Sequence, residues 1–230
     1  CLLMIDCQNL IKQYGSLLAV NNLSFQVRPG EVLGFLGPNG AGKTTTMRII
    51  AGFLPPTAGS ASVCGFDVER HATEAKRKIG YLPEGAPSYP EMSAQSFLEF
   101  IADSRELVGP HRDKRLKEVF NLLHLEPVLE QTIDTLSKGY RRRVGLAQAI
   151  LHDPEVLILD EPTDGLDPNQ KHEVRGLINQ MAESKIIIIS THLLEEVDAV
   201  CNRVIIIDRG QILADDTPKN LEARSRFHNA

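Results

Sequence analysis

No stretch of the sequence is apolar for long enough to cross a membrane. Its apolar runs are interrupted by polar or charged residues well before the ~18 residues that a spanning helix needs. The beginning of the sequence also lacks the basic and then apolar order of a secretory leader. We therefore expect a protein that neither spans the bilayer nor carries a signal for secretion.

Positive charge is not in surplus either. Lys and Arg number 25 against 30 Asp and Glu, and the formal net charge is -5. Because neutralising nucleic-acid phosphates requires clustered basic residues, this balance argues against nucleic acid as a partner. The only compact basic run is Arg141–Arg143, which we interpret as the solvated face of a helix.

Paired cysteines and internal repeats are missing as well. The four cysteines are scattered without a CxxC pair, so we expect no disulfide framework or zinc site and infer a reducing compartment. No low-complexity linker divides the 230 residues, a length that suits one large domain with or without an inserted lobe. We treat residues 1–230 as a single domain.

The sequence does contain short apolar runs that alternate with segments of helical character. Continuous apolar runs rich in β-branched residues are typical of buried strands in a parallel sheet, and they span residues 32–36, 156–159, 186–189 and 204–207. Helical patterns such as residues 44–51 and 172–182 lie between them. This alternation predicts an α/β fold with a mostly parallel sheet.

The beginning of the chain has a different pattern. Residues 4–10, 17–21 and 23–27 have the partial alternation of short strands, with turns at Tyr14-Gly15 and Asn21-Asn22. They predict an antiparallel sheet in the N-terminal part of the chain.

The middle of the chain lacks strand runs. From about residue 93 to residue 151 it is rich in Leu, Glu, Lys and Arg at helical spacing. We expect an inserted helical subdomain over residues 84–152, with residues 1–83 and 153–230 forming the β-rich core. A turn at residues 208–210 predicts a closing hairpin near the C-terminus.

A glycine-rich motif follows the first parallel strand. Residues 37–45 read GPNGAGKTT and fit the pattern GxxxxGK[ST]. Glycines let the backbone N–H groups point inward at phosphate oxygens, and the following helix adds its positive end. Lys43 then reaches the β- and γ-phosphates, and the Thr44 hydroxyl ligates Mg²⁺. A chance glycine-rich turn is the alternative, but a strand before and a helix after argue against it. The predicted nucleotide site comprises Gly37, Pro38, Asn39, Gly40, Ala41, Gly42, Lys43, Thr44 and Thr45.

Two acidic residues end another strand. Residues 156–161 read VLILDE, so four apolar residues lead to Asp160 and Glu161 at the carboxyl end, where open α/β sheets bind ligands. Asp160 suits a direct or an indirect role on Mg²⁺, and Glu161 is placed to orient or deprotonate an attacking water. Alone, such a pair often only faces solvent. Together with the phosphate loop, it predicts one of the many P-loop ATPases.

Three further motifs narrow the choice. Residues 136–143 read LSKGYRRR, residues 164–167 read DGLD, and residues 190–192 read STH at a strand end. With GPNGAGKTT and VLILDE, this ordered set resembles the nucleotide-binding domain of ABC transporters over nearly the whole chain. In that family, GPNGAGKTT corresponds to Walker A and VLILDE to Walker B. LSKGYRRR corresponds to the signature, usually written LSGGQ. DGLD corresponds to the D-loop, and His192 in STH to the switch histidine. The resemblance implies a P-loop NTPase core with a mostly parallel sheet, an N-terminal antiparallel β-subdomain and an inserted helical subdomain.

The resemblance also assigns roles to single residues. It implies that Tyr14 stacks on adenine and that Val20 packs near the ribose. It implies that ATP is hydrolysed, with Glu161 activating water and with His192 and Lys43 stabilising the charge on the transferring group.

Two kinds of protein partner are implied in the same way. Ser137 by itself predicts a helix N-cap, and in the family Ser137 and Gly139 would bind the ATP held by a second subunit. Two ATP molecules would be sandwiched in a homodimer, or in a dimer with a related ATPase subunit. A separate transmembrane permease subunit would be driven, its short helix docking near residues 84–92. This implies a cytoplasmic protein, peripheral on the inner face of the cell membrane.

Two sites depart from the general family pattern. Lys138 and Tyr140 stand where the signature usually has glycine and glutamine, and Glu84 stands where a glutamine is usual. Both variants resemble a bacterial branch that includes the ATPases of ABC-2-type exporters and the gliding-motility ATPase. Glu84 is a candidate ligand of Mg²⁺, although it adds negative charge beside the γ-phosphate.

Other functions are weighed against export. A soluble ABC ATPase that remodels ribosomes or DNA usually resembles two fused cassettes or carries a long coiled-coil insert, and the sequence has neither. LSKGY and the STH strand end argue against a P-loop kinase, and the lack of an NKxD-like motif argues against a GTPase. We predict an ATPase subunit of an exporter, with soluble remodelling as the alternative.

Overall fold

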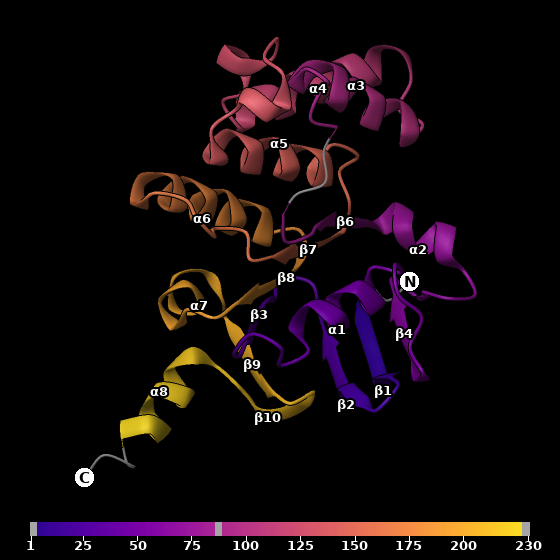
Figure 1. The fold of residues 1–230 in the computed structure, drawn as a ribbon, viewed down its shortest axis with the longest axis vertical. Coiled ribbons are helices and arrows are strands. Elements are labelled where there is room, and N and C mark those ends of the chain that lie inside the picture. The colour runs from indigo at the N-terminus through magenta and orange to yellow at the C-terminus, as the bar shows by residue number, and fades with distance from the viewer. Residues whose placement is uncertain (1–3, 86–88, 227–230) are drawn as a thin grey trace.

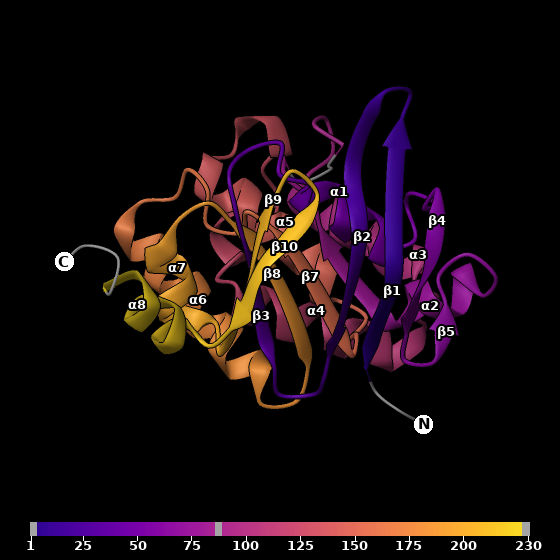
Figure 2. The same cartoon turned by 90° about the horizontal axis from the view of Figure 1, so that it is seen from below.

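Two β-sheets organise the computed structural model, which describes residues 4–85 and 89–226 (Figure 1). The larger sheet has six strands in the order β10-β9-β3-β8-β7-β6, and the smaller has four in the order β2-β1-β4-β5. Seen from below, the smaller sheet lies on one side of the larger one and helices α6, α7 and α8 lie on the other (Figure 2).

The six-stranded sheet brings several strand ends to one edge. Its strands are β6 (Ile79–Leu82), β7 (Val156–Asp160), β8 (Ile186–Thr191), β3 (Val32–Leu36), β9 (Arg203–Asp208) and β10 (Gln211–Asp216). All neighbouring pairs are parallel except β9 and β10, which form the predicted hairpin. Asp160 pairs with Ser190, and Leu36 pairs with Thr191. The carboxyl ends of β3, β7 and β8 therefore lie side by side.

The four-stranded sheet is antiparallel, as predicted. Its strands are β1 (Ile5–Tyr14), β2 (Leu17–Val27), β4 (Ala58–Val63) and β5 (Phe66–Asp67). The turn at Tyr14-Gly15 is confirmed, but the turn predicted at Asn21-Asn22 is wrong. There β2 continues through an irregular register, with Asn22 in the left-handed region at a φ of 57°.

The helices divide into two groups. Those around the sheets are α1 (Lys43–Ile50), α2 (Ala72–Lys78), α6 (Pro168–Ala182), α7 (Leu194–Val200) and α8 (Pro218–Arg226). Those between β6 and β7 are α3 (Ala94–Ser104), α4 (Gly109–Leu122), the short turns η1 (Glu126–Val128) and η2 (Ile133–Thr135), and α5 (Lys138–Ile150). This second group lies together at the top of Figure 1. The predicted α/β class with an inserted helical region is confirmed.

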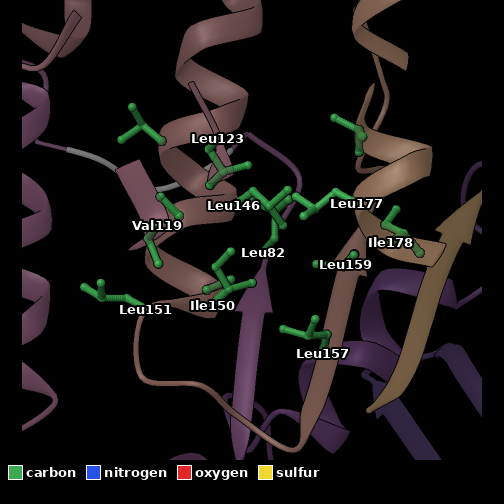
Figure 3. Close-up of a cluster of buried hydrophobic side chains, with 14 of the residues drawn as sticks. Leu82, Val119, Leu123, Leu146, Ile150, Leu151, Leu157, Leu159, Leu177 and Ile178 are labelled. Carbon is green, nitrogen blue, oxygen red and sulfur yellow. The ribbon is translucent and has the colours of Figure 1, made fainter. Parts of the chain in front are cut away.

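Two hydrophobic clusters hold these layers together. In one, Met47 and Ile50 of α1 pack with residues of both sheets, such as Leu10 and Phe35. In the other, α5 and α6 cover the opposite face of the parallel sheet. Figure 3 shows Leu146 and Ile150 of α5 beside Leu82, Leu157 and Leu159 of the strands, with Leu177 and Ile178 of α6 alongside. Over the described ranges, no helix combines the length and apolarity needed to span a bilayer.

Candidate active site

The phosphate loop leaves the carboxyl end of β3 and leads directly into α1. Gly40 and Gly42 have φ values of 80° and 105°, in the region that side chains disfavour. A Cβ added to Gly37 would lie 2.2 Å from the carbonyl oxygen of Ile207, and one on Gly42 would lie 2.5 Å from that of Ala19. The curled loop therefore requires glycine where the motif has it.

Neighbouring strands support the loop from behind. The N–H of Gly210, in the turn between β9 and β10, donates to the carbonyl oxygen of Ala41 at 2.9 Å. The N–H of Asn21 in β2 donates in turn to the carbonyl of Gly210 at 2.8 Å. Ala41 is buried, whereas Pro38, Asn39 and Gly40 form an exposed rim. The support fixes the loop so that its rim faces solvent.

Lys43 begins α1 and turns its side chain back over the loop. Its Nζ donates to the carbonyl oxygens of Gly37 at 2.6 Å and of Pro38 at 3.1 Å, and the residue is only 6% exposed. Thr44 and Thr45 follow it, half-buried. The loop thus presents an ammonium group, two hydroxyls and the positive end of a helix at one place.

A cleft of about 560 Å³ opens over the loop and collects residues from distant parts of the chain. Its lining includes Tyr14, Asn39, Gly40, Gly42, Lys43, Thr44, Thr45, Glu84, Glu161 and His192, all predicted, together with Leu17, Ala19 and Asp164, which were not assigned to it. Tyr14 stands half-exposed at the end of β1, with the ammonium of Lys12 5.3 Å from its ring centroid. An exposed aromatic ring beside a phosphate loop suits stacking on a nucleotide base.

The ribose contact expected for Val20 is not supported. The side chain of Val20 is 0% exposed and packs in the core with Ile5 and Leu10. The residue points inward because burial alternates along β2. Ala19, which precedes it, faces the cleft instead.

Glu161 follows β7 in an unusual backbone conformation. Its φ is 49°, and its N–H donates to the side-chain oxygen of Ser190 at 3.0 Å and to the Ser190 carbonyl at 3.2 Å. Burial raises the pKa of the Glu161 carboxyl above its ordinary value, although the hydrogen bond from His192 and the charge of Lys43 oppose the rise. A carboxylate with a raised pKa is better suited to accept a proton.

His192 lies at the end of β8 and faces Glu161. Its Nδ1 is 3.2 Å from Oε1 and 3.1 Å from Oε2 of Glu161. Because a carboxylate can only accept, this contact assigns the proton to Nδ1 and makes Nε2 the accepting nitrogen of the ring. The two predicted catalytic side chains, 31 positions apart, are therefore in direct contact.

The residues predicted to hold Mg²⁺ differ in their placement. Thr44 and Glu84 line the cleft, whereas Asp160 is fully buried behind it. One carboxylate oxygen of Asp160 accepts from the Ser190 hydroxyl, and the other, Oδ2, has no hydrogen-bond partner in the described part of the chain. Within residues 4–85 and 89–226, no group of three His, Cys, Asp or Glu side chains could hold a metal alone. Two carboxylates and a hydroxyl fit Mg²⁺ that is held partly by phosphate oxygens.

Ser137 and Gly139 lie at the beginning of α5 and do not line this cleft. Ser137 is the N-cap, since its side chain accepts from the N–H of Tyr140 at 3.3 Å, which confirms the predicted cap. A Cβ on Gly139 would lie 2.3 Å from the side chain of Gln170. The α5 N-terminus is therefore fitted closely to the start of α6, outside the chain's own cleft.

The interpretation of Arg141–Arg143 as a solvated face is wrong for two of the three residues. Arg141 is exposed, but Arg143 pairs with Glu173, and Arg142 is buried against main-chain carbonyl oxygens. The helical spacing of Gly139, Arg142 and Leu146, all buried, could have identified the inward face from the sequence.

Comparison with known proteins gives consistent matches. A family model described as "ABC transporter" matches residues 20–164. The linearmycin resistance ATP-binding protein LnrL of Bacillus subtilis (strain 168) is 36% identical over 222 residues, or 96% of this chain and 71% of that protein. Nod factor export ATP-binding protein I of Burkholderia pseudomallei (strain 1710b) is 38% identical over 218 residues, covering 94% and 72% of the two chains.

Solved structures match over almost the whole fold. A structure described as the ATP-binding subunit of an ABC transporter has a TM-score of 0.89 and 27% identity, covering 99% of this chain and 95% of that one. A dimeric ATP-binding cassette in a post-hydrolysis state, bound to ADP and Pi, has a TM-score of 0.85 at 24% identity, covering 93% and 98%. The latter supports the fold.

Proposed function

The chain belongs to the ABC transporter ATP-binding family, and on that premise we propose that it hydrolyses Mg-ATP to power a separate membrane-spanning exporter subunit, of the ABC-2 type. The observation that carries the proposal is the convergence of Tyr14, the phosphate loop and the Glu161–His192 pair on one cleft. That the relatives named above are described by Nod factor export and by linearmycin resistance supports the direction of transport.

The residues divide the chemistry among them. Loop N–H groups and Lys43 bind the phosphates, and Tyr14 stacks on the base. Thr44, Asp160 and Glu84 would hold Mg²⁺, which would supply neutralisation of the phosphate charge. The Glu161 carboxylate accepts a proton from the attacking water, and the His192 ring, held by Glu161 at Nδ1, turns Nε2 toward the transferring group.

The site is completed by a second subunit. Ser137 and Gly139 begin a helix and so lie where N–H groups can bind a phosphate, but they do not line the cleft of their own chain. A second copy, or a related ATPase subunit, would bring them to the γ-phosphate. ATP then holds the dimer closed, and hydrolysis removes the link and lets it open.

A groove between the core and the helical region supports a membrane partner. It has a volume of about 790 Å³, and its lining combines apolar residues such as Phe53, which is 62% exposed, and Ile101 with charged residues such as Lys76, Arg77 and Glu106. We propose that a short helix of a permease subunit docks there and that the chain works in the cytoplasm, on the inner face of the membrane. We keep residues 84–152 as the proposed helical subdomain; within the expected docking segment 84–92, residues 86–88 lie outside the described residues.

Glu161→Gln tests the proposed function. The variant should bind ATP normally but hydrolyse it roughly 10²–10⁴-fold more slowly, because an amide cannot accept the proton. Calorimetry gives the affinity and phosphate release gives the rate. Gel filtration with Mg-ATP should show a stable dimer of the variant, since its ATP is retained.

Glu183→Gln provides the matched control, because Glu183 is exposed at the end of α6 and away from the cleft. It should behave like the unmodified protein in all three measurements. Normal turnover by Glu161→Gln, with no dimer in Mg-ATP, would refute both the assigned base and the ATP-closed dimer.

A further inference from the structure

The side chain of Arg142 is buried, and main-chain oxygens surround it. The residue lies on α5 and is 9% exposed. Its Nε donates to the carbonyl of Pro162 at 3.0 Å, its Nη1 donates to the carbonyl of Pro83 at 3.3 Å, and its Nη2 donates to those of Asp160 and Glu161. One guanidinium group thus joins α5 to the segment after β7 and to the end of β6.

Three consecutive carbonyl groups converge on this cation. Successive carbonyls of an extended strand point to opposite sides, so residues 160–162 can share one donor group only if the chain turns. The turn is at Glu161, whose φ of 49° lies in the left-handed region that residues with a Cβ disfavour. Residues held in that region need surrounding contacts that fix them.

Glu161 is held from both sides of its backbone. Ser190 accepts from its N–H, and its carbonyl oxygen accepts from Arg142 and, at 3.1 Å, from the N–H of Asp164. The backbone of Glu161 determines where its carboxylate lies relative to His192. Removing the guanidinium would take away the donor group that the carbonyls of Asp160, Glu161 and Pro162 share, and would leave the Glu161 carbonyl to the N–H of Asp164.

We propose that Arg142 is a positioning residue that holds Glu161 in the conformation needed for water activation. The inference rests on the proposed role of Glu161 as the base. Arg142 also connects the proposed catalytic base with the proposed contact to the second subunit. It lies one helical turn from Gly139, the residue expected to bind the ATP held by that subunit. A merely structural Arg142 would instead hold α5 against the sheet, without a specific effect on the chemical step.

Arg142→Lys tests the proposal, because lysine keeps the charge but not the planar fork of donors. We expect kcat to fall about 10²-fold, the order of loss that follows a small misplacement of a catalytic group. KM, the ATP dissociation constant and the melting temperature should stay close to those of the unmodified protein. Arg143→Lys is the matched control, since Arg143 is the next residue and pairs with Glu173 of α6.

The double variant Arg142→Lys/Glu161→Gln separates positioning from structure. If Arg142 acts through Glu161, adding Arg142→Lys to Glu161→Gln should cause no further loss of single-turnover hydrolysis. Arg142→Gln, which retains amide donors, is a second variant for the case that Arg142→Lys does not fold. It should then fold and keep part of the normal hydrolysis rate.

The proposal would be overturned if Arg142→Lys and Arg143→Lys hydrolysed ATP at equal rates. It would also be overturned if the rate losses of Arg142→Lys and Glu161→Gln multiplied in full in the double variant. Loss of folding in both Arg142 variants would overturn it as well, because the residue would then serve stability alone. If Glu161→Gln itself hydrolyses ATP normally, the proposed function fails first. If Glu161→Gln is slow and Arg142→Lys is normal, only the present inference fails.

Discussion

The ammonium group of Lys43 lies within hydrogen-bonding distance of two carbonyl oxygens of its own loop. These contacts hold the side chain across the loop, and no carboxylate within residues 4–85 and 89–226 forms an ion pair with it. A phosphate can therefore take the ammonium from weak neutral acceptors rather than from an ion pair. The residue is poised for an anionic ligand.

Lys43→Ala should weaken ATP binding by about 10- to 100-fold, because a hydrogen bond to a charged group contributes roughly 1.5–3 kcal/mol. The fold should be unaffected, as judged by circular dichroism. Lys117→Ala, which removes an exposed lysine of α4, is the control and should leave affinity unchanged. An affinity for ATP that Lys43→Ala does not lower would mean that the loop is not the phosphate site.

Sequence predicted single residues well where a motif is contiguous. The loop residues and Ser137 occupy the expected local structures, because strand, glycine turn and helix cap are all short-range effects. Val20 and Arg142 were misjudged because each depends on which way one side chain faces. That direction is set by packing between elements distant in the chain.

At the scale of elements, α7 is attached to the site by one buried carboxylate. Glu196 is 5% exposed and accepts from the hydroxyls of Thr163 and Thr191 and, at 3.4 Å, from the ammonium of Lys171. Burial alone would raise the pKa of Glu196, but these donors outweigh it and hold the pKa below its ordinary value. The contacts join α7 to the loop after Glu161 and to the residue before His192.

Glu196→Gln should lower the free energy of unfolding at pH 7 by about 1.5–3 kcal/mol, the range for hydrogen bonds to a charged group. A depressed pKa stabilises the fold above the unfolded-state pKa, roughly 4.3, and this contribution is lost as pH falls through the lower folded-state pKa. The difference between the two proteins should therefore shrink in acid. Denaturant titrations from pH 7 to pH 3 measure it.

Glu195→Gln is the control for this experiment. The carboxylate of Glu195, the residue next to Glu196, is exposed and pairs with Arg175 at the surface. It should change stability little at any pH. A difference for Glu196→Gln that persists unchanged in acid would contradict the charge-dependent role of Glu196.

Prediction of whole elements followed the strength of the local pattern. The continuous apolar runs of β3, β7, β8 and β9 were identified because they are buried on both faces. The strand β4 was missed, since Ala58–Val63 consists mostly of small residues without apolar alternation. The false break at Asn21-Asn22 came from turn-forming residues that the sheet accommodates as an irregularity.

At the scale of the whole molecule, one chain carries two parts of the proposed site that do not line one cleft, although Arg142 of α5 contacts the backbone of Glu161. The cleft with the phosphate loop, Glu161 and His192 lies at the strand ends, and the N-terminus of α5 with Ser137 and Gly139 does not line it. The side-by-side order of β7 and β8, which puts Glu161 against His192, is a property of the sheet that no single motif encodes. If each copy completes the other's site, two complete sites form in a symmetric dimer.

Mixing two inactive variants tests this shared site most directly. Lys43→Ala disables the phosphate loop, and Ser137→Arg blocks the signature, so each variant alone should have no complete site. In a mixed dimer, the intact loop of one subunit meets the intact signature of the other. Mixing equal amounts should restore ATP hydrolysis to about a quarter of the normal rate, because half of the dimers are mixed and each has one working site. A mixture that stays as inactive as its components, although mixed dimers form, would contradict the account.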